Sequence, residues 1–319
     1  MSQSVTLTEA SHHERSGTGV SPASAPPSPA ADVKEKSGFD FAGASELGAL
    51  TQPPTFSSVQ EEREYIKVRL CAAIRIFAQM GMDHHVRDPE NRHNFWVNPF
   101  GLAFRLMTVE DLILVNYEGK VIAGGKPGRR IVNLAGFRVS SSKQLRGASQ
   151  MANVLANSAI LKIHSAIHRA RPEVQAICHS HSVYGKAFST LGKPLAITTQ
   201  DSCAFYNDIA LLRDFGGVVI NEGESNTIAD TLQKKKAIIL QNHGILTVGT
   251  TIDSAVAWFI LLETQCQVQL LSDAAGKTVE IDEPQAVFTA KELATERAGY
   301  LSASPYFQVI EHLQGHEYR

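Results

Sequence analysis

The residues best suited to chemistry in this chain are three histidines in two short motifs. The stretch "CHSHSVYG" places His179 and His181 two positions apart, and "LQNHGILTVG" supplies His243 within an apolar, strand-like run. Residues i and i+2 of a strand point to the same face, so the paired imidazoles would lie side by side. Neutral imidazoles bind divalent metals and leave positions open for water or substrate. The pattern predicts a metal centre, although His243 alone would also fit a hydrogen-bonded core histidine.

The elements that must carry these histidines follow from hydrophobic periodicity and turn residues. "VQAICHSHS" is a buried strand, between a helix over 158–171 that Pro172 ends and a helix over 182–191 that Gly192 closes. The NHG motif falls within a predicted strand over 236–249, and a long helix over 251–276 follows it. The other expected elements are a capped helix from Ser58 to about Gly81, a strand beginning at 95, a hairpin over 111–125, short strands over 193–200 and 216–220, and a helix over 224–235.

Composition excludes several classes of partner. The chain has 319 residues, 43% hydrophobic and 19% charged, which is ordinary for a globular protein. Its net charge of −2 gives no indication of nucleic-acid binding, and no apolar run approaches the about 20 residues that span a membrane. The four cysteines are scattered with no C-x-x-C pair, and the first residues lack the apolar core of a signal peptide. We therefore expect reduced thiols and a cytoplasmic protein with neither nucleic acid nor membrane as partner.

The chain divides into three parts by composition. Residues 1–55 are rich in Ser, Pro and Ala, bury too little apolar surface to offset ordering entropy, and are expected to form a disordered tail. Residues 56–275 form the predicted folded domain that carries the histidine motifs, and 276–319 a C-terminal extension that packs on the domain or on a neighbouring subunit. Helices around mostly buried strands predict an α/β fold. The sequence contains neither G-x-G-x-x-G nor G-x-x-x-x-G-K-[ST], which disfavours the common nucleotide-binding folds.

The two histidine motifs together resemble the class II aldolase/adducin family. "RPEVQAICHSHSVYG" is followed some sixty residues later by "AIILQNHGILTVG", and the resemblance, which extends to fungal-type adducin-domain members, covers roughly residues 60–272. It implies a three-layer αβα fold with a central, mostly antiparallel sheet, assembled as a homo-tetramer or another homo-oligomer. In catalytic members the matching histidines, here His179, His181 and His243, hold a divalent metal that polarises a substrate carbonyl or enediolate. The resemblance implies Zn²⁺, with Fe²⁺ or Mn²⁺ as alternatives.

One position departs from the catalytic pattern of the family. Its sugar-phosphate aldolases carry a glutamate nineteen residues ahead of the first paired histidine, as a metal ligand and general acid/base. The matching residue here is Ile160, which can neither bind a metal nor transfer a proton. The sugar-phosphate reaction is therefore in doubt. In addition, residues 134–156 have no expected counterpart in the family and are interpreted as an insertion.

Other side chains near the motifs are candidates for the missing proton transfer. His164, on the helix before the paired histidines, is a candidate proton-transfer group or a histidine at the polar edge of that helix. The loop "TTQDSCAFYND" approaches the metal in this fold. From it, Asp201 would orient a ligand histidine, Tyr206 would donate to a developing oxyanion and Gln200 would contact substrate. An ordinary polar loop is the alternative interpretation of all three.

Two further residues are candidates for substrate binding. "MDHHVRDPENRHNFWVNPFG" resembles a segment that lines the family's pocket, with Asp83–His85 in a turn and Arg87 free to pair with a substrate carboxylate. The alternative for Arg87 is a loop arginine in a salt bridge. Family aldolases use a C-terminal tyrosine from a neighbouring subunit, for which Tyr306 is the candidate here, with core or interface packing as its alternative.

Three functions remain open from the sequence. The first expectation is a metal-dependent lyase that makes or breaks a carbon–carbon bond in a small carbonyl substrate through a metal-stabilised enolate. The second is a non-haem Fe²⁺ oxygenase or oxidative decarboxylase on the same fold, acting on aromatic acids. The third is an adducin-like module without chemistry that binds the actin cytoskeleton. The intact histidine triad disfavours the third, because the equivalent adducin domain lacks one.

Overall fold

The computed structural model describes residues 52–78, 83–99, 102–126, 158–217 and 222–319, which all belong to one compact unit, Ser45–Arg319. The predicted tail falls outside this part of the chain except for residues 52–55, and so does the insertion predicted over 134–156. The strand expected over 216–220 also lies outside it from residue 218 onward.

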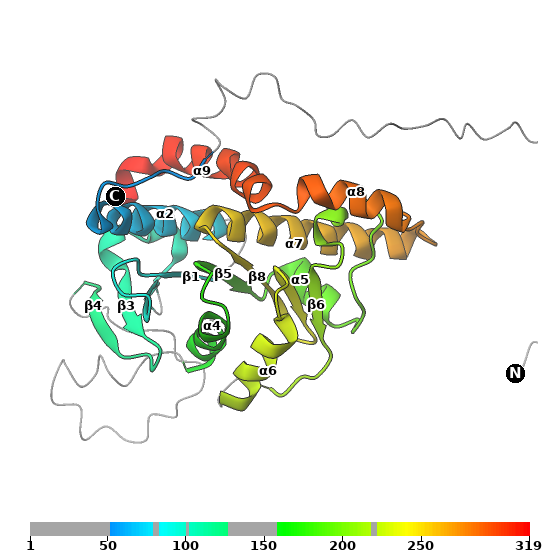
Figure 1. The fold of residues 1–319 in the computed structure, drawn as a ribbon, viewed down its shortest axis with the longest axis horizontal. Coiled ribbons are helices and arrows are strands. Elements are labelled where there is room, and N and C mark those ends of the chain that lie inside the picture. The colour runs from blue at the N-terminus through cyan, green and yellow to red at the C-terminus, as the bar shows by residue number, and fades with distance from the viewer. Residues whose placement is uncertain (1–51, 79–82, 100–101, 127–157, 218–221) are drawn as a thin grey trace, which may run out of the picture. The chain divides into compact units, whose positions relative to one another are not determined.

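Eight described strands form one sheet in the order β4-β3-β2-β1-β5-β8-β7-β6 (Figure 1). Every neighbouring pair is antiparallel except β6 and β7, which confirms the predicted, mostly antiparallel sheet. The strands span Asp83–Arg87 (β1), Asn94–Val97 (β2), Ile113–Asn116 (β3), Val121–Gly124 (β4), Ala176–Ser180 (β5), Ile209–Leu212 (β6), Ala237–Leu240 (β7) and Gly244–Gly249 (β8).

Helices cover both faces of this sheet, which confirms the three-layer α/β prediction. Figure 1 shows α2 and α7 on one face, α4 and α6 on the other, and α8 and α9 outside α7. The helices span Val59–Ala78 (α2), Ser158–Ala170 (α4), Val183–Ser189 (α5), Glu222–Leu232 (α6), Ile252–Ala275 (α7), Glu283–Leu293 (α8) and Glu296–Tyr318 (α9). Short 3₁₀ turns occupy Phe104–Leu106 (η2), Val109–Asp111 (η3) and Asp201–Phe205 (η4).

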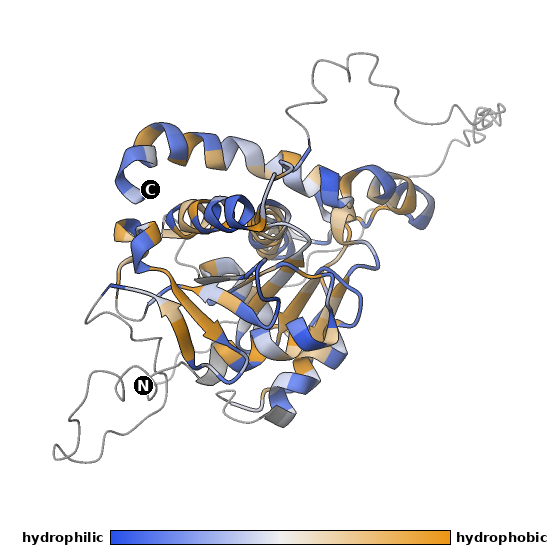
Figure 2. Ribbon diagram, turned by 60° about the vertical axis from the view of Figure 1, so that its left-hand side comes forward, coloured by the Kyte–Doolittle hydropathy of each residue, from blue (hydrophilic) through white to orange (hydrophobic). Residues whose placement is uncertain are grey.

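The two faces of β5 show how strand alternation divides the core. Cys178 packs in the cluster beneath α2 and α7, whereas Ile177 packs in a second cluster beneath α4 and α6. Figure 2 shows the corresponding pattern in the strands, which are mostly hydrophobic, and in the helices, which carry hydrophilic outer faces. His179 shares the α4 face with Ile177, because alternate residues of a strand point the same way. None of the described helices is long and apolar enough to cross a membrane.

Local capping explains where the long helices begin. The Ser58 hydroxyl accepts the N–H of Glu61 at 3.1 Å, as the predicted N-terminal cap of α2 requires. The Glu61 carboxylate bonds to the N–H of Ser57, at 2.8 Å, instead of reaching back to Ser58. At the start of α7, the Thr251 side chain accepts the N–H of Ser254 at 3.0 Å. Both helices thus satisfy N–H groups that would otherwise lack partners.

Three sequence-based predictions of elements were wrong. Residues 193–200 form no strand, because their backbone bonds elsewhere: the Ile197 carbonyl accepts from Ile281, and the Ala196 N–H donates to the Gln269 side chain. Asp83–His85 belong to strand β1, paired with β2 and β5, and not to a turn. The single strand predicted over 236–249 is two strands, β7 and β8, joined by a tight turn. Strand β6 was not predicted.

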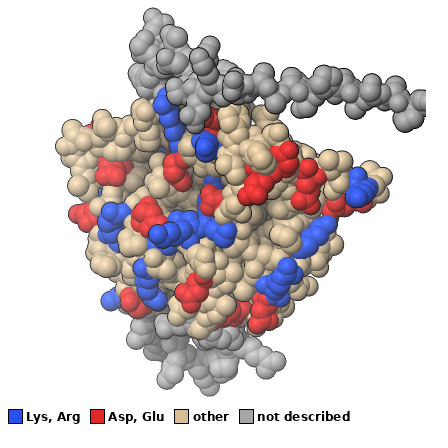
Figure 3. All heavy atoms as spheres, turned by 45° about the vertical axis from the view of Figure 1, so that its right-hand side comes forward, with Lys and Arg blue, Asp and Glu red and all other residues tan. Residues whose placement is uncertain are grey.

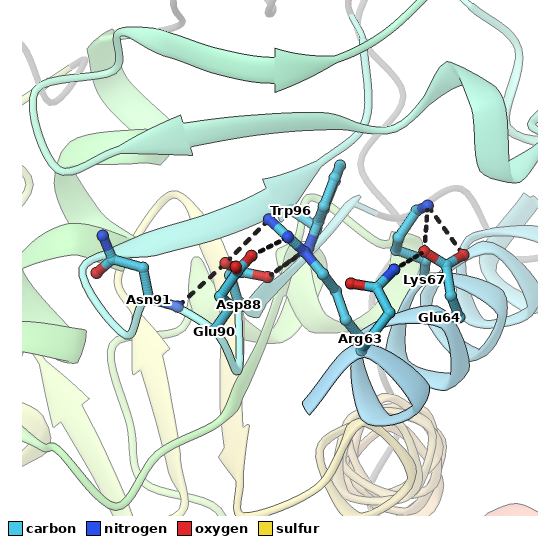
Figure 4. A network of polar contacts seen from close by, with 8 residues as sticks. Arg63, Glu64, Lys67, Asp88, Glu90, Asn91 and Trp96 are labelled. Carbon is cyan, nitrogen blue, oxygen red and sulfur yellow. Dashed lines mark hydrogen bonds and ion pairs between the residues drawn. The ribbon is translucent and has the colours of Figure 1, made fainter. Parts of the chain in front are cut away.

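A polar network ties α2 to the loop between β1 and β2 (Figure 4). Asp88 is fully buried and accepts from the Trp96 indole N–H at 3.1 Å and from the backbone N–H of Asn91 at 3.2 Å. Arg63 of α2 pairs with the same carboxylate at 3.0 Å and also with Glu90. A buried carboxylate is stabilised only when such donors surround it, so the network fixes the loop between β1 and β2 against α2.

The C-terminal helix α9 packs against α7 and α2. A Cβ on Gly299 would lie 2.6 Å from Cζ2 of the Trp258 ring, so only glycine permits this close approach of α9 to α7. Arg69 of α2 joins the same helices, because it pairs with Asp253 of α7 and at 2.9 Å with Glu311 of α9. Helix α9 is therefore held against the outer surface of α7 and beside α2.

Candidate metal centre

The structure brings the three predicted ligand histidines together at one end of β5 and β8. Their potential ligand atoms all lie within 4.8 Å of one another, and no other group of this kind occurs among the described residues. The imidazole centroids are 5.4 Å apart for His179 and His181, 4.9 Å for His179 and His243, and 4.7 Å for His181 and His243. Three nitrogen donors at this spacing fit a single divalent ion.

His179 is oriented by the backbone of the neighbouring strand. Its Nδ1 lies 3.0 Å from the carbonyl oxygen of Ile245 in β8, and His179 itself is 2% exposed. A carbonyl can only accept, so Nδ1 carries the proton and Nε2 keeps its lone pair for a metal. The sequence-based interpretation assigned the orientation of a ligand histidine to Asp201, but for His179 this role belongs to Ile245.

The NHG motif forms the turn between β7 and β8. Asn242 adopts a left-handed conformation, with φ of 59°, which asparagine tolerates better than most residues. The N–H of His243 donates to the carbonyl of Leu240 at 3.0 Å and closes the turn. A Cβ on Gly244 would lie 2.5 Å from the Ser180 carbonyl oxygen, so glycine lets β8 approach the end of β5. Each letter of the motif thus has its own physical reason.

The environment keeps two of these imidazoles neutral. Burial, reinforced by the neighbouring His181, lowers the pKa of His243 from 6.5 to about 4. Burial also lowers the pKa of His181, and the charge of Lys186 adds to the effect. A metal ligand must offer a lone pair, and a neutral imidazole does so near pH 7. His179 is buried, His243 is partly buried and His181 is exposed, so the centre opens to solvent on the His181 side.

The loop residues predicted to act at the site lie on and after η4. Gln200 and Asp201 are exposed at its start, and in the described chain neither side chain bonds to a triad histidine. The Tyr206 hydroxyl donates to the Glu283 carboxylate of α8 at 3.2 Å. Partial burial and this carboxylate both raise the pKa of Tyr206. The roles predicted for Gln200 and Tyr206 remain predictions.

His164 and Arg87 are both buried. His164 lies on α4 with no exposed surface, and its predicted part in proton transfer remains a prediction. Arg87, at 4% exposed, donates to the carbonyls of Val174, Arg92 and His168 at 3.2, 2.7 and 3.1 Å. The same guanidinium contacts the Tyr117 hydroxyl at 3.2 Å and Nδ1 of His168 at 2.9 Å. These bonds favour the structural alternative for Arg87, although its partners are neutral groups and not the carboxylate of a salt bridge. Arg87 is the last residue of β1, whereas Asp83 at the other end of that strand pairs with His179.

The sequence-based analysis missed two features of the site. The Ile245 carbonyl that orients His179 is a backbone atom, for which residue type gives no signal. Glu263 is a buried carboxylate that contacts the segment after His181. Its signal was present, because Glu263 is the one charged residue between Asp253 and Asp273 in the mostly apolar helix predicted over 251–276. Tyr306, predicted to reach a neighbouring subunit, is 43% exposed on α9.

The fold and the site are those of the class II aldolase/adducin family. The profile of the family described as "Class II Aldolase and Adducin N-terminal domain" matches residues 68–270. This chain belongs to that family, which confirms the resemblance seen in the histidine motifs. The enzymes of the family depend on a metal, and the three histidines of this chain fit one.

Relatives of the chain carry names of different enzymes. It is 40% identical to "Decarboxylase NovR" of Streptomyces niveus, over 80% of this chain and 87% of that protein. It is 38% identical to "4-hydroxy-3-prenylphenylpyruvate oxygenase/4-hydroxy-3-prenylbenzoate synthase" of Streptomyces roseochromogenus subsp. oscitans, over 79% and 84%. A solved structure described as L-fuculose 1-phosphate aldolase from Glaciozyma antarctica PI12 is 68% identical, with a TM-score of 0.72, over 86% of this chain and 99% of that one.

Proposed function

We propose that this chain is an Fe²⁺-dependent oxygenase or oxidative decarboxylase that acts on a small aromatic acid. The observation that carries the proposal is the donor set. It consists of three imidazoles, with Ile160 in place of the glutamate of the sugar-phosphate aldolases, and no described carboxylate joins the triad. Such a set suits Fe²⁺ and leaves positions open. The names of the relatives at 40% and 38% identity support this choice over the lyase expected first from the sequence.

In this proposal, the described residues bind the metal and form the entrance for substrate. His179, His181 and His243 would hold the metal, which when bound would supply Lewis-acid and oxygen-activating chemistry. Substrate would enter on the side of His181, because the other two histidines are less exposed. Val183 and Tyr184 follow His181 and are 68% and 37% exposed. Their apolar surface beside the site supports an aromatic substrate.

A lyase is the second candidate, and one observation favours it. The solved structure at 68% identity is described as an aldolase. In that reaction the triad would hold Zn²⁺ and the substrate would be a small carbonyl compound. Since Ile160 cannot transfer a proton, His164 or Tyr206 would take that part. The same triad therefore serves either reaction, and the metal and the co-substrate distinguish them.

The proposal extends to assembly and location. We place the protein in the cytoplasm as a homo-oligomer, in which Tyr306 reaches a neighbouring subunit. All four cysteines are buried thiols, which supports a reducing compartment. Acidic and basic side chains lie interspersed on the face shown in Figure 3, which supports a small-molecule substrate over a nucleic acid.

The experiment uses full-length protein purified without a histidine tag. Metal content is measured by mass spectrometry for the unmodified protein, for the double variant His179→Ala, His181→Ala, and for His312→Ala, an exposed histidine on α9 that serves as control. The metal-free protein is then loaded with Fe²⁺ or Zn²⁺. Each form is given 4-hydroxyphenylpyruvate in an oxygen electrode, or L-fuculose 1-phosphate in an assay of aldol cleavage.

Each result points to one function. Oxygen uptake with release of CO₂, in the Fe²⁺ form and absent from the double variant, supports the proposal. Cleavage of the sugar phosphate by the Zn²⁺ form without oxygen uptake would replace it by the lyase. Sub-stoichiometric metal that is unchanged in the double variant would contradict both and leave the adducin-like binding module.

A further inference from the structure

A buried carboxylate on α7 contacts the segment that follows one of the metal ligands. Glu263 is 6% exposed and accepts the backbone N–H of Tyr184 at 2.9 Å, the N–H of Gly185 at 2.7 Å and the hydroxyl of Ser182. Among the described residues, no lysine or arginine forms an ion pair with Glu263. These N–H and O–H groups therefore compensate its negative charge.

The bonds to Glu263 supply the cap that α5 lacks locally. Ser182 occupies the N-cap position of α5, but its side chain accepts no bond from the N–H groups of its own helix. Glu263 accepts from that end of the helix although it lies 78 to 81 positions away in the chain. A carboxylate suits this position, because the N-terminal end of a helix carries a partial positive charge.

This cap constrains the backbone segment that carries His181. Strand β5 ends at Ser180, and α5 begins two residues after His181, so His181 lies in a short link between them. One end of the link is held by the pairing of Ser180 with Ile245, and the other by Glu263. A Cβ on Gly185 would lie 2.7 Å from Ile245 Cγ1 and 2.9 Å from the Glu263 carboxylate. The start of α5 therefore fits closely against both residues.

We propose that Glu263 is a positioning residue, which holds His181 in the orientation for metal binding by capping α5. This inference rests on the metal site of the proposed function, but not on the reaction performed there. The same helix offers a matched control. Gln269 is also buried, at 4% exposed, and its side chain accepts the N–H of Ala196 at 2.9 Å, in a segment that does not contain a ligand.

The test compares Glu263→Gln with Gln269→Ala in the full-length protein. Glutamine keeps the shape of the side chain but replaces one acceptor oxygen by a donor that faces other donors. Metal-free protein is titrated with Co²⁺ and followed by its visible absorption, and competition with a chelator gives Kd. Because the loss of a residue that orients a ligand typically weakens metal binding, we expect Kd to rise about 10–100-fold for Glu263→Gln, with an altered spectrum, and by less than about threefold for Gln269→Ala.

A rescue variant separates positioning from general destabilisation. Ser182→Asp, added to Glu263→Gln, places a carboxylate at the N-cap position itself, where it can accept the N–H of Gly185. We expect this double variant to regain most of the lost Co²⁺ affinity. The inference is overturned if Glu263→Gln binds Co²⁺ as tightly as the unmodified protein, or loses no more affinity than Gln269→Ala.

The outcomes also separate this inference from the proposed function. If the unmodified protein binds Co²⁺ through the triad and Glu263→Gln weakens that binding, the inference stands even where the Fe²⁺ form consumes no oxygen. If the unmodified protein binds no Co²⁺, both proposals fail together.

Discussion

Replacing Arg87 by methionine tests whether this side chain is structural or binds substrate. Its guanidinium joins three backbone carbonyls, those of Val174, Arg92 and His168, and so connects the end of β1 to the end of α4 and the chain leading into β5. Its Nη1 also lies 3.2 Å from the Tyr117 hydroxyl. Methionine resembles the arginine stem in size but donates no hydrogen bond, so these acceptors lose the donor that Arg87 supplies, while the Arg92 carbonyl keeps the Tyr117 hydroxyl at 3.4 Å.

The expected loss follows from which carbonyls are buried. Val174 and His168 are each 1% exposed, and a buried acceptor left without a donor costs about 1–3 kcal/mol. Arg92 is exposed, so water can replace the bond to its carbonyl. For the two buried carbonyls together, we therefore expect Arg87→Met to lower the free energy of unfolding by about 2–6 kcal/mol, out of the about 5–15 kcal/mol typical of a folded protein.

Urea-induced unfolding, followed by circular dichroism at constant metal content, measures this difference. The control is Arg92→Met, which removes an exposed arginine that donates to the carbonyl of Pro172 at 3.1 Å and should cost less than about 1 kcal/mol. The structural interpretation would be refuted if Arg87→Met unfolded like the unmodified protein while its KM for a carboxylate substrate rose at least about tenfold, a loss of about 1.4 kcal/mol in binding.

Further outcomes follow from the site and from the helix contacts. Because burial lowers the pKa of His243 from 6.5 to about 4, the unfolded metal-free protein binds more protons than the folded one in this range. The free energy of unfolding of the metal-free protein should therefore fall as the pH is lowered from 6.5 to 4. Urea unfolding at several pH values measures this dependence, which should be weaker for His243→Gln. Gly244→Ala, whose Cβ would meet the Ser180 carbonyl at 2.5 Å, should lose about 1–3 kcal/mol and bind metal more weakly in a titration. Gly299→Ala, whose Cβ would meet the Trp258 ring at 2.6 Å, should destabilise by a similar amount of about 1–3 kcal/mol. Gly299→Ala should leave the metal content unchanged but make proteolytic cleavage of α9 faster. Equal rates of cleavage in the variant and the unmodified protein would contradict the packing role of Gly299.

The chemistry of the site could be predicted from local sequence. The spacing of His179 and His181 brings one to the end of strand β5 and the other directly after it, and the NHG histidine completes the donor set. The strand before α5 and the long helix α7 were also predicted, because their apolar runs, capping residues and terminating glycines act within a few residues of each other. Ile160 likewise predicted, by residue type alone, the loss of the glutamate of the sugar-phosphate aldolases, and among the described residues no carboxylate joins the triad.

The turn at the NHG motif could not be predicted from hydrophobic periodicity and capping residues. The stretch over 236–249 is apolar on both sides of Gln241–His243, and hydrophobic periodicity does not decide whether these polar residues lie within one long strand or turn between two paired ones. The chain reverses there because Asn242 accepts a left-handed conformation and Gly244 lets β8 approach the Ser180 carbonyl, and both requirements arise from the partner strand. For the same reason, residues 193–200 look like a strand but bond to α7 and to the chain before α8.

The partners of the functional side chains were decided only by the tertiary structure. Sequence alone left Arg87 either as a substrate ligand or as a loop arginine in a salt bridge, and it left Glu263 unnoticed. The fold surrounds Arg87 with carbonyls and brings Glu263 to the start of α5. The physical reason is that residue type determines which bonds a side chain can make. Its burial, and the groups that face it from segments about 80 residues away, determine which bonds it does make.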